Sequence, residues 1–328
     1  MYRYVLRRLL WVIPVMFGVL IIVFTITYLT PGDPVMVKLG ADYTQEQYDL
    51  MAAQLGLDKG YFGQLGSYIW NLITRFDLGK SFSSSVPIAS EISARLPITF
   101  RIGVMSLSIG ILLGIPLGIL SAIRQYSITD VSLTSLALLL AAIPNFILAI
   151  LALLFFGVQL RWLPIAGLTT FKHWILPVGT SALSGIAVMM RMTRTTMLEV
   201  IRQDYIRTAR AKGLKKSVII RRHALNNCLI PLVTIIGGVT AITLAGSVIV
   251  ETIFSIPGMG MYMMNGIAAR DYPVINGVVL TLAAIVCCIN LLVDVLYAFI
   301  DPRIKGFYIP DKKRKELREL VETEGEAV

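Results

Sequence analysis

A basic segment between two apolar blocks holds the residues whose types and spacing point most directly to a function. Residues 191–222 include ten Lys or Arg and only two acids, Glu199 and Asp204. Lys and Arg resist translocation and accumulate in cytoplasmic loops of membrane proteins. The pattern Ala209-x-x-x-Gly213, followed by a second apolar and basic run, predicts two short helices around a glycine turn. Such a segment would project from the membrane and be bound by another protein.

The first of these helices, predicted at residues 204–212, has its charges in the favourable order. An acid begins it and basic residues end it, which complements the helix dipole. Gly213 supplies a left-handed stop at little steric cost. The alternative is an ordinary basic loop beside anionic lipid. We predict that Tyr205 and Ile206 anchor the helix, that Ala209 and Ala211 leave a shallow surface for a partner, and that Arg207 and Arg210 pair with a partner's acids.

Composition places the chain in the class of integral membrane proteins. It is 56% hydrophobic and 15% charged, with a mean hydropathy of +0.74. Soluble domains average roughly 45–50% apolar and about 25% charged residues. The apolar residues form blocks near or above the ~20 residues that cross a bilayer. The net charge of +10 does not indicate nucleic-acid binding, because the basic residues flank apolar spans instead of forming one exposed stripe.

The apolar blocks predict an all-α membrane protein with six transmembrane helices, organised as one domain over residues 1–328. The first apolar core is too long for a signal peptide, so we expect an uncleaved first helix. Alternation then places both termini and the basic segment in the cytoplasm, and Pro144-Asn145 predicts a kink in the third span. The predicted spans are about 9–30, 97–123, 131–160, 173–190, 229–254 and 274–300, with a long external loop at 31–96, a cytoplasmic coupling loop at 191–228 and a cytoplasmic tail at 301–328.

Few ionisable residues fall within these spans. Glu251 lies near the outer end of the fifth span and Asp294 in the inner part of the sixth. Intramembrane ionisable residues are functional candidates by default. We expect Glu251 to hydrogen-bond the following turn or, as the alternative, to line a pathway, and Asp294 to join helices. Two such residues are too few for a proton relay, which favours a passive conduit driven from elsewhere.

The remaining reactive side chains give no sign of an enzyme or a metal site. Cys228, Cys287 and Cys288 have neither disulfide nor metal-ligand spacing, so we expect them to pack. His173 and His223 fall on opposite sides of the membrane, so they form no catalytic cluster. The chain also lacks the phosphate-binding pattern G-x-x-x-x-G-K-[ST] of ATPases. No metal or cofactor is expected on this chain.

The basic segment resembles the coupling segment of permeases from ATP-binding-cassette (ABC) importers. Of the general pattern of that segment, this chain keeps only Ala209 and Gly213. Arg207, Thr208 and Asn226 stand at positions where the pattern has other residues. The variant DYIRTARAKGL, then RRHALNN, then LIP resembles the dipeptide/oligopeptide permease family. The resemblance covers nearly the whole chain through YVLRRLLWVIPVMFGV, PGDP, DLGKS, ARLPITF, VETIFSIPGMG, RDYPV and DVLYAFIDPR.

This resemblance implies a type I importer permease fold in a bacterial or archaeal plasma (inner) membrane. The chain would be a non-enzymatic subunit that forms a peptide pathway with a homologous permease subunit. Two cytoplasmic ABC ATPase subunits would use ATP and Mg²⁺, and an extracytoplasmic solute-binding protein would deliver the peptide. The residues that would receive an ATPase are Asp204, Tyr205, Arg207, Thr208, Ala209, Arg210, Ala211, Lys212 and Gly213.

Two further sets of candidate residues follow from the resemblance and from polarity. In the external loop, Asp33, Asp77 and Gly79 would cap the pathway and contact the binding protein, although Asp and Gly also suit simple turns. Within the spans, small or polar residues would line the pathway, although such residues more often pack helices. The pathway candidates are Ser106, Asn145, Ser247 and Glu251.

Other substrates and classes remain as alternatives. The same family includes importers of nickel and of oligosaccharides, and no His or Cys cluster argues for nickel. An autonomous secondary transporter would carry inverted repeats and buried ionisable residues, and neither is clear in this sequence.

Overall fold

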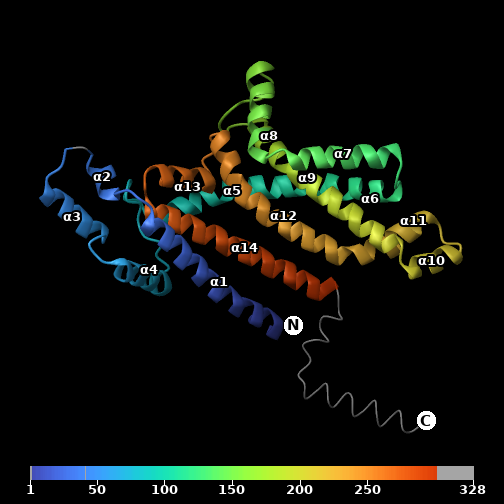
Figure 1. The fold of residues 1–328 in the computed structure, drawn as a ribbon, viewed down its shortest axis with the longest axis horizontal. Coiled ribbons are helices and arrows are strands. Elements are labelled where there is room, and N and C mark those ends of the chain that lie inside the picture. The colour runs from blue at the N-terminus through green and yellow to red at the C-terminus, as the bar shows by residue number, and fades with distance from the viewer. Residues whose placement is uncertain (1, 41, 301–328) are drawn as a thin grey trace, which may run out of the picture.

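The protein is a bundle of long helices with short helices at both of its ends (Figure 1). This computed structural model describes residues 2–40 and 42–300. Within those residues the chain forms α-helices, π-helical turns and one isolated antiparallel bridge, between Lys80 and Pro87. The all-α prediction is confirmed. The predicted tail at 301–328 lies outside the described residues.

Five helices of the described part are long and apolar enough to cross a membrane, and a bent pair gives a sixth crossing if it counts as one span. The long helices are α1 (Tyr2–Leu29), α5 (Ile88–Ile109) continued by η1 (Gly110–Gly114) and α6 (Ile115–Ile123), α9 (Lys172–Ile201), α12 (Leu225–Ile253) and α14 (Tyr272–Ile300). The bent pair consists of α7 (Ile128–Ala142) and α8 (Asn145–Ala152), the latter continued by η2 (Leu153–Gln159).

The bent pair replaces the third predicted span. Its two parts meet at 95°, so the break at Pro144 is far sharper than the kink that the sequence predicts. Ile143 has an extended backbone with ψ 121°, and Pro144 is the N-cap of α8. A proline disfavours the helical conformation of the preceding residue and cannot donate a backbone hydrogen bond, which explains why the helix ends there.

Several helices extend beyond the predicted spans. The second span begins at Ile88 and has Pro97 inside it, and α9 continues to Ile201. Before α12, the short α11 (Lys216–Val218) and η3 (Ile219–Ala224) prolong the helix into the basic segment. The predicted loop at 191–228 is therefore mostly helical. Hydropathy falls where charged residues begin, but charged residues such as Lys, Arg and Glu are good helix formers.

The short helices define two ends of the bundle. The α4 end carries α2 (Pro34–Leu39), α3 (Gln45–Leu55), α4 (Tyr61–Arg75) and α13 (Met259–Ala268). The α10 end carries α10 (Asp204–Ala211) and α11, and the beginning of α1 and the end of α14 point the same way (Figure 1).

Three glycines bring the second span close to α9, the helix with the most neighbours in the bundle. A Cβ on Gly114 would lie 2.8 Å from the Cβ of Met189, and one on Gly118 would lie 2.5 Å from the carbonyl oxygen of Met190. Gly110 precedes them at the same spacing of four residues, so the three form one helical face. Small residues at this spacing let transmembrane helices approach closely.

Glu251 ties the α4 end together. Its carboxylate is fully buried and accepts hydrogen bonds from the Thr99 hydroxyl (2.7 Å) and from the backbone N–H groups of Gly260 (2.7 Å) and Met261 (3.3 Å). It thereby caps α13, whose N-terminus favours a negative charge. A Cβ on Gly258 would lie 2.3 Å from this carboxylate. Glu251 thus bonds the following turn, and its burial leaves it no access to a pathway surface in this conformation.

Replacing Glu251 by Ala should destabilise the protein strongly. The Thr99 hydroxyl, the buried N–H of Gly260 and the partly buried N–H of Met261 would lose their acceptor. Hydrogen bonds to a charged group contribute about 1.5–3 kcal/mol each. We expect a clear fall in the thermal unfolding midpoint of the detergent-solubilised protein. Thr252→Ala, an exposed neighbour, should change it little. Equal midpoints for the two variants would contradict the capping role.

Candidate functional site

The apolar side of α10 packs on η3 and on the ends of α6, α9 and α12. Ile206 is fully buried and Ala209 is 6% exposed. Both belong to one hydrophobic cluster that draws on α6, α9, η3 and α12. Its other buried members are Ala122, Met197, Ile219, Ala224, Cys228 and Leu232. A displacement of α10 must therefore displace the ends of these helices, because closely packed interiors transmit strain.

The position of Ala209 corrects one prediction. The sequence predicts that Ala209 and Ala211 leave a shallow surface for a partner. Ala209 instead faces the chain's own core, whereas Ala211 is exposed. The small side chain at Ala209 serves close packing of α10 on its own bundle, and only Ala211 remains as a small residue on the outer face.

The outer face of α10 is polar and open. Tyr205 is 43% exposed, and the Arg207 guanidinium lies 3.7 Å from the carboxylate of Asp204 in an exposed pair. Exposed pairs of this kind contribute about 0–1 kcal/mol, so both charges can exchange partners readily. The other exposed residues of this face are Thr208, Arg210, Ala211 and Lys212. This arrangement suits a docking surface for an acidic groove.

The turn after α10 has the predicted glycine conformation. Gly213 has φ +76°, and its N–H donates to the carbonyl of Arg210 at 2.9 Å. The N–H of Leu214 donates to the carbonyl of Ala209 at 3.4 Å. A Cβ on Gly213 would meet no atom within 4 Å. The requirement for glycine is therefore conformational, worth roughly 1–2 kcal/mol, and leaves the space beside the turn open.

A bidentate ion pair fixes the connection between α6 and α7 to α9. The Arg194 guanidinium donates to both carboxylate oxygens of Asp130, at 2.7 and 2.9 Å. Asp130 is buried and also accepts from the Ser121 hydroxyl and from the Tyr126 N–H. Ser121 is the neighbour of Ala122 in the α10 cluster. Sequence reasoning missed this pair, because Asp130 and Arg194 lie 64 residues apart and neither stands in a recognisable motif.

Cys228 behaves as a packing residue in the same cluster. Its thiol lies 3.4 Å from the sulfur of Met197. Burial raises the pKa of the Cys228 thiol to about 11, so it stays protonated at neutral pH. Within residues 2–40 and 42–300, no three His, Cys, Asp or Glu side chains are grouped so that they could hold a metal ion.

The predicted pathway residues are fully or partly buried in this conformation. Ser106 and Ser247 are buried and donate to the carbonyls of Val178 and Leu244. They pack helices in this conformation and, like Glu251, do not reach a pathway surface. Asn145 is half-buried at the start of α8, and its Oδ1 is buried without a hydrogen-bond partner among the described residues. A pathway role for Asn145 stays a prediction.

The three external candidates have local structural roles. Asp33 caps α2 by accepting from the N–H of Val35 (2.8 Å) and from the Tyr48 hydroxyl (2.6 Å). This hydrogen bond raises the pKa of Tyr48. Asp77 accepts from the N–H of Gly79 (2.8 Å), which has φ +88°. These contacts explain Asp and Gly at these positions, and a role toward a binding protein remains a prediction.

Asp271 is a second residue that sequence reasoning missed. Its buried carboxylate accepts from the Ser81 hydroxyl (2.6 Å) and from the N–H groups of Phe82 and Ser83 (both 3.0 Å). It thus joins the RDYPV pattern to the loop after DLGK. Its neighbour Arg270 donates to the carbonyl of Pro31 at 2.9 Å in the PGDP pattern. Three patterns that are far apart in sequence meet at the α4 end.

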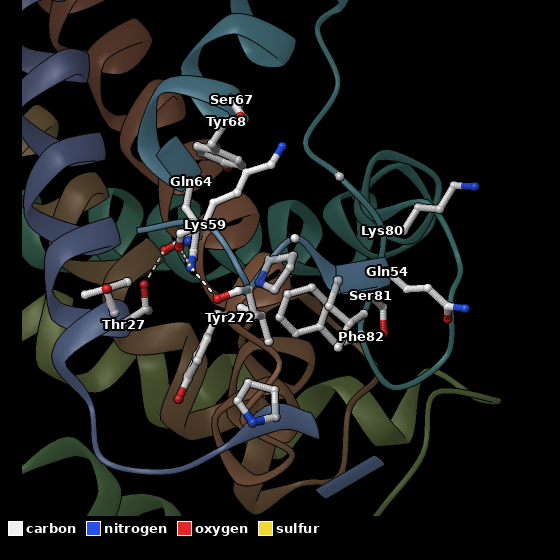
Figure 2. A pocket seen from close by; sticks show the side chains of 18 of the residues that line it. Thr27, Gln54, Lys59, Gln64, Ser67, Tyr68, Lys80, Ser81, Phe82 and Tyr272 are labelled. Carbon is white, nitrogen blue, oxygen red and sulfur yellow. Dashed lines mark hydrogen bonds between the residues drawn. The ribbon is translucent and has the colours of Figure 1, made fainter. Parts of the chain in front are cut away.

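A pocket of about 760 Å³ opens between these segments. Figure 2 shows Lys59, Gln64 and Tyr68 on one side of it and Ser81 and Phe82 on the other. The lining mixes hydroxyl, amide and ammonium groups with aromatic rings. The pocket is formed by α1, helices α2 to α4, the loop that follows α4 and the start of α14.

Two family comparisons match the chain. The binding-protein-dependent transport system inner membrane component family matches residues 114–306, and the N-terminal domain of the same kind of protein matches residues 1–103. Together the two matched regions cover nearly all of the described residues.

Curated relatives of similar length are named for peptide transport. A putative peptide transport system permease protein of Brucella abortus is 40% identical over 309 residues, covering 92% of this chain and 98% of the relative. The dipeptide transport system permease protein DppB of Escherichia coli is 37% identical over 337 residues, covering 93% and 99%. The glutathione transport system permease protein GsiC of Pectobacterium atrosepticum is 38% identical over 305 residues, with the same coverage.

A solved structure shares the fold. A chain of the MetNI methionine ABC transporter in inward-facing conformations superposes with a TM-score of 0.56 at 19% identity. The match covers 64% of this chain and 96% of that chain. At this identity the similarity establishes the architecture, which is that of a type I importer permease.

Breaking the Asp130–Arg194 pair should loosen the α10 end. Removing one partner of a buried ion pair costs about 3–5 kcal/mol, and the partial exposure of Arg194 places the expected loss near the lower limit. We expect Arg194→Met and Asp130→Asn each to lower the thermal unfolding midpoint. The double variant should lose less than the sum of the two. Strict additivity in this double-mutant cycle would show that the two side chains do not interact.

Proposed function

Because the chain belongs to the family of binding-protein-dependent transport system inner membrane components, we propose that it is the permease subunit of an ATP-driven importer of di- or oligopeptides. The observation that carries the coupling role is the two-sided α10, which packs on η3 and the ends of α6, α9 and α12 on one side and is open on the other. Relatives named for peptide, dipeptide and glutathione transport support a peptide substrate.

In this proposal the outer face of α10 docks on a separate ABC ATPase subunit. Arg207, Arg210 and Lys212 would pair with acids of the ATPase, and Tyr205 and Ala211 would fit its apolar groove. A homologous permease subunit would present a second coupling helix to a second ATPase. The α10 end then faces the cytoplasm, which agrees with its excess of Lys and Arg.

The packing of α10 supports a mechanical account of coupling. ATP binding would close the two ATPases and draw the coupling helices together. Ile206 and Ala209 would transfer this displacement to the ends of α6, α9 and α12. The Asp130–Arg194 pair would keep the α6–α7 connection in register with α9. The pathway would then open on the α4 side, and ATP hydrolysis would reset it.

The peptide pathway would lie between the two permease subunits. Asn145, at the break between α7 and α8, has a buried amide oxygen without a partner among the described residues, which would accept from a peptide N–H once the helices around it separate. A solute-binding protein would deliver peptides at the α4 end, where Asp33, Asp77 and Gly79 shape the surface turns. Both chain termini would be cytoplasmic.

Purification of the tagged protein in gentle detergent tests the assembly. We expect a homologous permease subunit and one or two ATPases to co-purify. The assembly should then hydrolyse ATP faster when a peptide-loaded binding protein is added. Recovery of the chain alone or as a homo-oligomer, without an ATPase, would instead indicate an autonomous transporter.

Bulk on the outer face of α10 should uncouple ATP hydrolysis from uptake. Ala211→Trp and Gly213→Trp place a large group beside the proposed docking surface, where the turn itself has free space. We expect peptide uptake per ATP hydrolysed to fall by about tenfold or more, equivalent to about 1.4 kcal/mol of lost coupling. Both proteins should still reach the membrane, as membrane fractionation will measure.

Matched variants separate coupling from folding. Ala211→Ser preserves size and should retain uptake. Ala209→Trp should instead lower stability, because Ala209 packs inside the chain. Normal uptake by both exposed Trp variants would contradict the docking role of α10.

A further inference from the structure

One side of α4 is an apolar surface without a partner in the described residues. Phe62, Trp70, Ile73 and Phe76 are 84%, 67%, 65% and 85% exposed. Their spacing places them on one side of the helix and its C-terminal cap, together with the half-buried Ile69. Large contiguous apolar surfaces of this kind mark contacts with a protein or a membrane.

The opposite side of α4 is polar and has a different environment. Gln64, Ser67, Tyr68 and Asn71 recur at intervals of three, one and three residues and line the 760 Å³ pocket. Figure 2 shows Gln64, Ser67 and Tyr68 together on this helix. The hydroxyl of Thr74, near the apolar face, donates a hydrogen bond to the carbonyl of Trp70 within the same helix, at 2.6 Å. The helix is thus amphipathic, with a lined pocket on one side and bare aromatic residues on the other.

Contacts with α1 fix the level of α4 relative to the membrane. The hydroxyls of Tyr61 and Thr25 lie 2.7 Å apart, and the Tyr61 ring contacts those of Phe24 and Tyr28 at 5.9 and 5.1 Å. Phe24 precedes the end of α1 at Leu29 by five residues. At 1.5 Å per residue, α4 therefore meets α1 about 7 Å inside the end of that membrane-spanning helix.

The same contacts indicate how α4 is oriented. Tyr61 and Tyr68, two turns apart on α4, both pack on Phe24, each with ring centroids 5.9 Å from it. A helix that ran along α1 would meet residues about seven positions apart. Helix α4 therefore crosses α1 instead of running along it.

We propose that α4 is an interfacial helix whose Phe62, Trp70, Ile73 and Phe76 side chains enter the lipid at the α4 end of the spans. Interfacial helices lie roughly 5–10 Å within the boundary between headgroups and acyl chains, which matches the level of the α1 contact. Trp and other aromatic side chains favour this region. The proposal does not depend on the transported substrate.

The apolar residues of α1 at the same level and the charge of α4 favour lipid over a protein as the occupant. Ile22, Ile26 and Leu29 are exposed on the membrane-spanning α1 beside Phe24 and Tyr28, which contact α4. Residues 61–75 include no Asp or Glu, and Arg75 ends the helix, where its charge can reach the phosphates. In this position α4 would hold the external segment, and with it the pocket, at a fixed height on the bilayer.

Quenching of Trp70 fluorescence tests the proposal. The full chain, with Trp11, Trp162 and Trp174 replaced by Phe, is reconstituted in phosphatidylcholine vesicles that contain lipid brominated either near the headgroup or near the chain ends. We expect emission to fall by about half or more with bromine near the headgroup, because interfacial helices lie only about 5–10 Å deep. Bromine near the chain ends and aqueous iodide should quench much less.

A matched control places the reporter on another external helix. Leu50 of α3 is 59% exposed, so Leu50→Trp with Trp70→Phe in the same background should respond to iodide and not to brominated lipid. If the variant with three Trp→Phe substitutions does not fold, quenching is measured for the natural sequence and for Trp70→Phe. The difference between the two is then the contribution of Trp70. Quenching of Trp70 by iodide alone would overturn the proposal. Protection from both quenchers would also overturn it and would point to a protein on this face.

Discussion

The burial of Ile206 and Ala209 against η3 and the ends of α6, α9 and α12 is the contact on which the proposed transport mechanism depends. A helix attached only through a flexible loop could bind an ATPase without moving the membrane part. Close packing removes that freedom, because a well-packed cluster resists deformation. The glycines that face α9 from the second span extend this rigid contact further into the bundle.

The α4 end is organised by a different force. Two buried carboxylates, Glu251 and Asp271, accept hydrogen bonds from backbone N–H groups and hydroxyls that would otherwise be unsatisfied. Burying a carboxylate is costly unless several donors surround it. Each of these two carboxylates therefore fixes the arrangement of the turns whose N–H groups it accepts from. The α10 end is held mainly by apolar packing, with one ion pair beside it, and the α4 end by directional polar contacts.

The sequence predicts the parts of this protein that follow from local chemistry. The order of charges, Gly213 and the apolar blocks identify α10, its turn and the spans, and Glu251 bonds the following turn as expected. Partners far apart in the chain are not predictable in the same way. Nothing local links Asp130 to Arg194 or Asp271 to Ser81. The inward direction of Ala209 depends on how α10 is placed against other helices, which periodicity over eight residues cannot determine.

The Ser81–Asp271 contact spans 190 residues, and this separation has a consequence for biosynthesis. At about 5–20 residues per second, a ribosome needs roughly 10–40 s to progress from the first partner to the second. Throughout that interval the loop at Ser81 is already made but lacks its acceptor. The segment that carries Ser81 is therefore among the last parts of the molecule to mature, and a protease or chaperone that reaches it before Asp271 is made would meet it in an unfinished form.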